Sequence, residues 1–110
     1  MNFRNIEIYE IHAEFCRALA NPKRLMIINL LEDRKLTVGE LAAALDLTVS
    51  NISQHLKVMK NYQILSSEKV GHKVYYFLTD QRLVKTCEKI REIISDLYTK
   101  RRGIFTSDSS

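Results

Sequence analysis

The spacing of hydrophobic residues changes along the chain and divides it into helical and strand segments. Apolar residues that recur every three or four positions are typical of a helix with one buried face. That spacing predicts five helices, at about residues 6–20, 22–32, 38–45, 48–62 and 80–102. The pattern changes period in between, and it predicts strands at residues 65–70 and 73–78. The pair Gly71-His72 has the length of a hairpin turn, in which the glycine supplies a positive φ angle.

Capping residues mark where several of these helices begin. Asn21 can cap a helix whose first turn accommodates Pro22. Thr37 and Glu40 have the spacing of a capping box, in which each side chain accepts a hydrogen bond from the other residue's backbone N–H. Thr48 is expected to cap the next helix. The short helix in between is expected to bury one side, formed by Leu41, Ala44 and Leu45.

The predicted order of elements is α-α-α-α-β-β-α, a mainly α fold with a β-hairpin. A short helix, a tight turn at Asp46-Leu47, a polar-faced helix and a hairpin are together typical of a winged helix-turn-helix. We expect a single domain over residues 1–102 and a disordered tail at residues 103–110.

The helix predicted at residues 48–62 has an unusual exposed side. Its apolar residues Ile52, Leu56 and Met59 would form one buried stripe. The opposite arc carries short hydrogen-bonding side chains, one cation and no acid: Ser50, Asn51, Ser53, Gln54 and Lys57. Amides can pair with adenine edges, and hydroxyl groups can contact base edges or phosphates. We predict that this helix enters a DNA major groove; the alternative is a solvated face that happens to lack acids.

Residues around this helix complete the predicted DNA-binding surface. Lys69, His72 and Lys73 flank the hairpin tip and are expected to touch phosphate or the minor groove as a wing, although charged hairpin tips are also common in plain soluble turns. His55 lies at the edge of the polar arc, where it can contact a phosphate or lie over the neighbouring helix. The predicted DNA-binding residues are Thr48, Ser50, Asn51, Ser53, Gln54, His55, Lys57, Lys69, His72 and Lys73.

The composition favours an anionic partner and excludes several other classes of protein. The 110 residues carry a net charge of +4, with a pI of about 9.2. No run approaches the roughly 18 apolar residues of a membrane span, and the first residues lack the order of a signal peptide, so we expect a cytoplasmic protein with no membrane partner. There is no glycine-rich phosphate loop, no Ser-His-Asp set and no carboxylate pair in a predicted pocket. We therefore expect neither an enzyme nor a cofactor.

Several stretches of the chain resemble the ArsR (ArsR/SmtB) family of small bacterial and archaeal repressors. They are CRALANPKRLMIINLL, LTVGELAAALDLTVSNISQHLKVMK, LSSEKVGHKVYYFLTD and the helix that follows, and they span roughly residues 13–98. Within them, ANPKRL and SNISQHL are specific in combination. The resemblance implies a homodimer whose helix-turn-helix binds an operator and whose release follows the sensing of an inducer.

The resemblance also implies that the first and last helices form the dimer interface. The spacing of apolar residues in the last helix agrees independently, because Leu83, Cys87, Ile90, Ile94 and Leu97 are four, three, four and three positions apart, as in a coiled-coil seam. The predicted interface residues are Ile8, Ile11, Phe15, Leu83, Cys87, Ile90, Ile94 and Leu97.

The two common metal sites of the family are not matched by this chain. One needs a cysteine in the first helix of the helix-turn-helix, and LTVGELAAAL contains none. The other uses Asp and His near the start of the last helix, then His and Glu further along. Asp80 matches the first of these positions, but Arg82, Ile93 and Asp96 stand at the other three. One ligand of four does not hold Zn²⁺, so no metal is expected at either site.

Three interpretations of the cysteines remain open. Cys16 and Cys87 lie on the helices expected to dimerise, and they can simply be small buried hydrophobic residues. They can instead sense oxidants or reactive sulfur through a bridge that shifts the dimer geometry. Family members that do so usually carry the partner cysteine one helix later, near Ile28 here. Finally, they can bind a soft ion such as arsenite or zinc, with His12 as a third ligand.

We therefore predict a homodimeric repressor that binds double-stranded DNA at an imperfect palindrome and is released by an inducer. Thiol oxidation or reactive sulfur at Cys16 and Cys87 is the candidate signal, and a soft metal at the same residues is the alternative. A protein–protein adaptor without a DNA role is a different class that the same fold serves. The salt dependence of DNA binding separates a DNA-binding protein from an adaptor, because only the former releases counterions.

Overall fold

The computed structural model describes residues 5–102 of the chain, which forms two compact units. The first unit ends at Asp80 and the second begins at Gln81. The first unit contains, in chain order, α1 (Ile6–Leu19), α2 (Pro22–Leu30), β1 (Leu36–Thr37), α3 (Val38–Leu45), α4 (Val49–Asn61), β2 (Leu65–Val70) and β3 (Lys73–Leu78). The described part of the second unit is α5 (Arg82–Arg102). The predicted tail at residues 103–110 lies outside the described residues.

The predicted helix starts are confirmed by the hydrogen bonds at α2, α3 and α4. Asn21, which directly precedes Pro22, caps α2: its side chain accepts a hydrogen bond from the backbone N–H of Lys23 at 2.9 Å. The capping box of α3 is complete, since Thr37 Oγ1 accepts from the backbone N–H of Glu40 at 3.1 Å and Glu40 Oε1 accepts from that of Thr37 at 2.8 Å. Thr48 begins α4 in the same way. These bonds fix where each helix leaves its preceding loop.

The turn between α3 and α4 joins the two helices of the helix-turn-helix. Asp46 adopts the left-handed conformation, with a φ of 56°, which an Asp tolerates better than most residues. The expectation that Ala44 lies on the buried side of α3 is wrong, because Ala44 is exposed and the buried residues are Leu41 and Ala42. Leu45 is half-buried and lies between Leu41 and Ala42 around the helix axis. The buried side of α3 is therefore rotated from Ala44 toward Ala42.

The sheet contains one strand that the sequence pattern did not predict. Its order is β1-β3-β2, with all pairs antiparallel. Strand β1 is only two residues long, which is too short for any alternation of apolar and polar residues, and its second residue is also the cap of α3. The predicted β2–β3 hairpin is confirmed at its expected bounds, and Gly71 has the positive φ of 64° that its turn requires.

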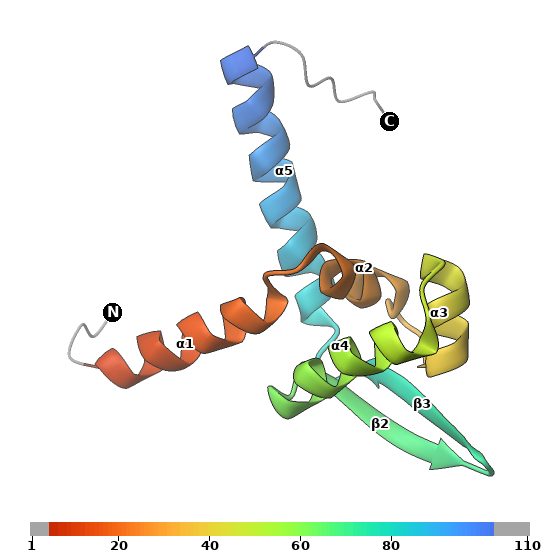
Figure 1. Cartoon of the computed structure of the whole chain (residues 1–110). Coiled ribbons are helices and arrows are strands. Elements are labelled where there is room, and N and C mark those ends of the chain that lie inside the picture. Colours follow the sequence, from red (N-terminus) through yellow and green to blue (C-terminus); the bar gives the residue numbers. More distant parts are fainter. Residues whose placement is uncertain (1–4, 103–110) are drawn as a thin grey trace. The chain divides into compact units, whose positions relative to one another are not determined.

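The core of the first unit lies between the helices and one face of the sheet. Helix α4 contacts α2, α3 and β2, and α3 also contacts β1 and β3. Figure 1 shows α4 running along the hairpin, whose tip projects beyond the helices at the lower right. The residues with almost no exposed surface in this unit are Ile27, Ile28, Leu31, Leu41, Ile52, Leu56, Met59, Ile64 and Leu65. No described residue with a polar or charged side chain is buried, so the core is held by apolar contacts alone.

Helix α5 has buried residues only near its beginning. Val84 and Cys87 are buried, whereas Ile90, Ile93, Ile94 and Leu97 are each between 42% and 53% exposed. None of the helices within residues 5–102 combines the length and the apolar composition that a bilayer span requires. The later turns of α5 therefore carry an exposed apolar stripe.

The capping box of α3 can be tested by removing one of its two hydrogen bonds. Thr37→Ala leaves the backbone N–H of Glu40 without its acceptor, and we expect a loss of about 1 kcal/mol in the free energy of unfolding. Glu40→Gln is the matched control, because a glutamine oxygen can still accept from Thr37. Urea denaturation followed by circular dichroism measures both variants. Equal stability of Thr37→Ala and the parent chain would show that the box does not hold the helix.

Candidate nucleic-acid interface

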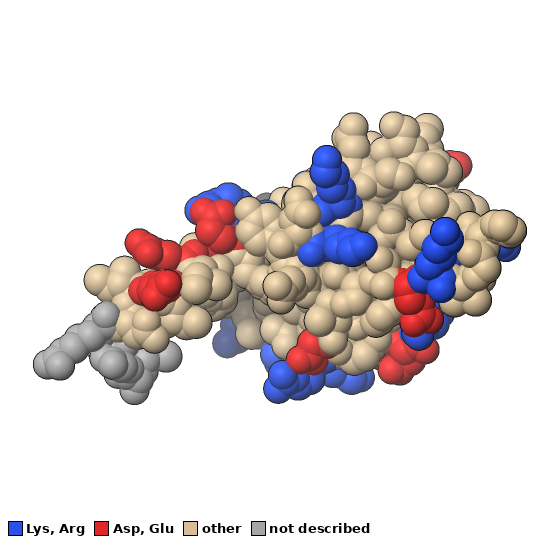
Figure 2. Space-filling model, turned by 90° about the horizontal axis from the view of Figure 1, so that it is seen from below, with Lys and Arg blue, Asp and Glu red and all other residues tan. Residues whose placement is uncertain are grey.

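The exposed side of α4 carries four of the ten residues predicted to bind DNA. Ser50, Ser53, Gln54 and Lys57 are exposed, while Ile52, Leu56 and Met59 are buried on the opposite side. The side chain of Thr48 accepts from the backbone N–H of Asn51 at 3.0 Å, so the predicted contact residue Thr48 is also the cap. Figure 2 shows Lys and Arg side chains projecting from a largely uncharged surface in the middle of the view, whereas acidic side chains gather on α1 at the left.

Asn51 differs from its neighbours on α4 in how its amide is presented. Its side chain is half-buried, and its Oδ1 is covered and accepts no hydrogen bond from any described residue. Pairing with both the N6 and N7 positions of adenine requires the amide oxygen and the amide nitrogen together. In this conformation Asn51 cannot make that paired contact, whereas the amide of Gln54 is exposed.

His55 lies against α2 rather than at the centre of the exposed face. Its Nδ1 accepts a hydrogen bond from Arg24 Nε at 3.2 Å, and Arg24 also donates from Nη1 to the backbone oxygen of Ala18 at 3.0 Å. One guanidinium group therefore joins the end of α1, the first turn of α2 and the middle of α4. Burial lowers the pKa of His55 below its ordinary value of 6.5, and the nearby charges of Arg24 and Lys23 lower it further. His55 is thus a neutral hydrogen-bond acceptor in this contact.

The hairpin presents its two lysines on opposite faces. Lys69 pairs with Val74 across the strands, and Val70 pairs with Lys73. Because cross-strand partners share a face and neighbours along a strand do not, one face of the tip carries Lys69 and Val74, and the other carries Val70 and Lys73. His72 is exposed in the turn between them.

Contacts behind the tip hold the hairpin against the rest of the first unit. Lys60 at the end of α4 donates to Ser67 Oγ at 2.6 Å. On the other face, Lys35 forms an ion pair with Glu68 at 2.8 Å, and its Nζ lies 4.8 Å from the centre of the Phe77 ring. The wing is therefore braced on both faces while its tip stays exposed.

The exposed apolar residues of this surface were not predicted from the sequence. Val49, the first residue of α4, is 51% exposed, and Val70 and Val74 of the hairpin are 57% and 40% exposed. The sequence did contain a signal, since Val49 directly follows the Thr48 cap and precedes the buried stripe.

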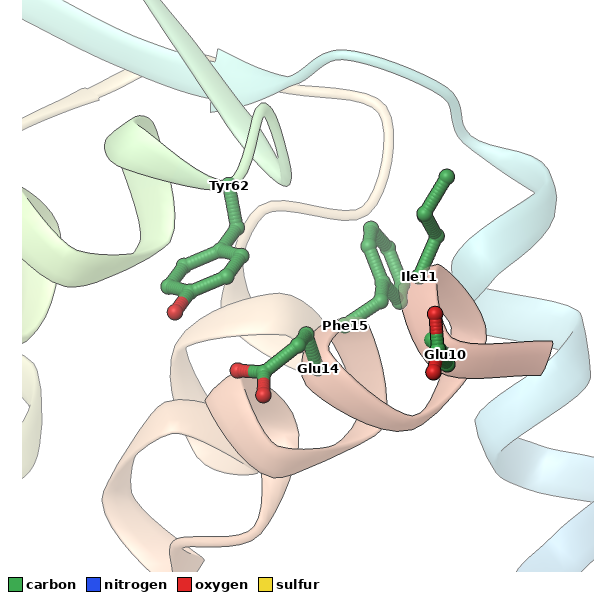
Figure 3. Close-up of a pocket in the computed structure, with 5 residues that line it drawn as sticks. All are labelled: Glu10, Ile11, Glu14, Phe15 and Tyr62. Atoms are coloured by element: carbon green, nitrogen blue, oxygen red, sulfur yellow. The ribbon is translucent and has the colours of Figure 1, made fainter. Parts of the chain in front are cut away.

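The predicted dimer-interface residues fall on both units. On α1, Ile8 and Ile11 are exposed and Phe15 is half-buried. Figure 3 shows Ile11 and Phe15 of α1 with Tyr62, the cap residue just after α4, around a depression of about 360 Å³ that Glu10 and Glu14 also line. On α5, Leu83 is half-buried, Cys87 is buried, and Ile90, Ile94 and Leu97 are exposed. Each helix thus leaves apolar surface uncovered.

The two cysteines differ in exposure. Cys16 on α1 is exposed, whereas Cys87 on α5 is buried. Burial raises the pKa of the Cys87 thiol, an effect that the charge of Arg91 partly offsets. A higher pKa lowers the thiolate fraction of Cys87 at neutral pH. Across the described residues, no three His, Cys, Asp or Glu side chains are grouped closely enough to hold a metal ion.

Comparison with known proteins connects this geometry to a family. A family profile described as "Bacterial regulatory protein, arsR family" matches residues 21–67, from the cap of α2 into β2. Nodulation protein NolR of Rhizobium meliloti is 33% identical over 87 residues, which cover 79% of this chain and 71% of that protein. A "Transcriptional repressor SmtB homolog" of Synechocystis is 31% identical over 84 residues, which cover 76% of this chain and 64% of the homolog. The crystal structure of NolR from Sinorhizobium fredii superposes with a TM-score of 0.73 at 32% identity, over 84% of this chain and 93% of the other.

The contact between Arg24 and His55 predicts a specific dependence of stability on pH. Because the folded chain lowers the pKa of His55, the unfolded chain takes up a proton first as the pH falls below 6.5. The contribution of this contact to the free energy of unfolding is therefore complete above pH 6.5. It is lost progressively as the pH falls below that value, until His55 of the folded chain is protonated as well. His55→Gln keeps an acceptor for Arg24 and does not titrate, so we expect a flatter stability profile between about pH 5.5 and 7.

Urea denaturation at several pH values measures this slope. His72→Gln is the matched control, because it removes a histidine from the hairpin turn and leaves the Arg24–His55 hydrogen bond in place. If the free energy of unfolding of His55→Gln changes with pH as steeply as that of the parent chain, groups other than His55 cause the pH dependence.

Proposed function

Because this chain belongs to the ArsR family of bacterial regulatory proteins and is therefore a DNA-binding transcriptional regulator rather than an enzyme, we propose that it is a repressor that binds its operator as a homodimer. The exposed face of α4 carries this proposal. It combines hydroxyl, amide and ammonium groups at the surface of a capped helix whose thirteen residues include no acid. A carboxylate on that face would be repelled by phosphates, and its absence leaves the helix free to enter a major groove.

The residues of α4 divide into base-contacting and phosphate-contacting groups. Gln54 is the best candidate for base recognition, because its exposed amide offers both a donor and an acceptor. Ser50 and Ser53 have short side chains, which let the helix come close enough for their hydroxyl groups to meet base edges. Asn51 would contribute its N–H donors. Lys57 is the candidate for a phosphate contact. Thr48 and His55 serve mainly to hold the helix, through the cap and through Arg24.

The wing is proposed to lie along a minor groove beside the major groove that α4 enters. Lys69 and Lys73 are on opposite faces of the hairpin, which suits a groove with a phosphate backbone on either side. Each lysine would then contact a different strand, and His72 would sit at the tip between them. These contacts carry no base preference and add affinity that falls with salt concentration.

The homodimer is proposed to form through the apolar surfaces of α1 and α5. Ile8 and Ile11 on α1, and Ile90, Ile94 and Leu97 on α5, are exposed in the single chain. Burial of such side chains is favourable by about 1.5–3 kcal/mol each, which is the driving force for association. A twofold-symmetric dimer presents two copies of α4, so the operator should be an imperfect palindrome with half-sites about one helical turn apart.

The proposed inducing signal is oxidation of the two thiols. Two thiols and one molecule of hydrogen peroxide give one disulfide and two molecules of water. Cys16 is exposed and would react first, giving a sulfenic acid that the thiol of Cys87 then attacks. A soft metal ion is the weaker candidate, because Cys16, Cys87 and His12 offer at most three ligands.

Gln54→Ala tests base recognition by α4. We expect the operator affinity to fall by about 1–3 kcal/mol and the preference at one base pair per half-site to relax. Lys57→Ala is the matched control on the same face, since a lost phosphate contact should weaken all sequences alike and reduce the salt dependence by about one ion. Fluorescence anisotropy with an operator selected from random duplexes, and with its single-base variants, measures both effects. Unchanged affinity and preference would remove Gln54 from the base-reading residues.

The thiol signal is tested with the same assay on reduced and peroxide-treated protein. We expect treatment to weaken operator binding by a factor of about 5 to 150, the usual range of allosteric coupling, and dithiothreitol to restore it. Cys16→Ser and Cys87→Ser should each bind the operator and ignore peroxide. A response that persists in Cys87→Ser would assign sensing to Cys16 alone, and an indifferent parent protein would remove both cysteines from induction.

A further inference from the structure

Val49 is an exposed apolar residue at the start of α4. It is the first helical residue after the Thr48 cap, and its side chain is 51% exposed. It is also the one large apolar side chain in Val49–Asn61 that is exposed, because the others in that helix are buried or half-buried. Ile52, Leu56 and Met59 form the buried stripe of α4 and Val58 is half-buried, but Val49 takes no part in the core.

The position of Val49 places it beside the residues proposed to contact bases. Ser50 is its neighbour in sequence, and Ser53 follows one helical turn later on the same side; both are exposed. Residues in the first turn of a recognition helix are the ones that reach the edges of bases in a major groove. Val49 would therefore meet the floor of the groove together with the two serines.

The chemistry of a valine side chain limits what it can recognise there. It has no hydrogen-bond donor or acceptor, and its branched Cβ restricts it to few rotamers. The major groove contains one apolar group, the C5-methyl of thymine. We propose that Val49 recognises thymine by packing against that methyl group, an inference that rests on the proposed function of α4 as the DNA-reading helix.

Replacing thymine by uracil in the operator tests this proposal, because it removes the methyl and leaves base pairing unchanged. The full-length protein first selects an operator from random duplexes, and each thymine of a half-site is then replaced in turn by deoxyuridine. We expect one replacement to weaken binding by about fourfold, the effect of one buried methyl group. Val49→Ala should weaken binding to the thymine operator by a similar factor and show no further loss with deoxyuridine at that position.

Val70→Ala is the matched control, since Val70 is similarly exposed, at 57% against 51%, but lies at the hairpin tip. It should keep the full penalty for deoxyuridine at the position that Val49 reads. Thermal melts establish that both variants are folded. The proposal would be overturned if the protein selects a sequence but no replacement of thymine by deoxyuridine weakens its binding. It would also be overturned if deoxyuridine weakens the binding of Val49→Ala as much as that of the parent protein. Failure of the parent protein to select any sequence would instead contradict the proposed function itself.

Discussion

The buried stripe of α4 decides which side chains this protein can offer to DNA. Ile52, Leu56 and Met59 are at most 2% exposed, and each contributes about 1.5–3 kcal/mol by leaving water. A helix has only one rotation about its axis that buries all three. Rotating α4 about its axis by one residue would push Ser53 or Lys57 toward the core. Burying an unpaired polar group there costs more free energy than burying an apolar side chain gains. The apolar side of the helix therefore fixes the orientation of the polar side.

Hydrogen bonds then set the position of α4 along its axis, which the apolar stripe alone leaves free. Thr48 fixes the first turn, Lys60 ties the last turn to Ser67, and His55 accepts from Arg24 in the middle. Arg24 also bonds to the last turns of α1 through Ala18. One side chain thus links the end of α1 to the middle of α4.

Sequence reasoning located the helices, the hairpin and its turn, because caps and apolar spacing are local properties. It missed β1, whose two residues pair with Tyr75 and Tyr76 far along the chain. It placed Ala44 on the buried side of α3, since an alanine fits either side and only the packing decides. Periodicity predicts the direction of a Cβ atom but not the rotamer of the side chain. The buried Oδ1 of Asn51 therefore could not be predicted from the sequence. The opposite faces of Lys69 and Lys73, by contrast, follow from strand register and were predictable.

The distribution of charge matters more for this protein than its modest net value of +4. The stretch from Thr48 to Lys73 contains four lysines and one glutamate, whereas α1 contains three glutamates and one arginine. A field that is positive over α4 and the wing attracts a polyanion there, and the acids of α1 disfavour its approach to α1. The apolar residues of α1, beside Glu10 and Glu14, are therefore poorly suited to nucleic acid. A protein partner explains their exposure better, so in the proposed dimer the apolar residues of α1 and the exposed face of α4 would serve different contacts.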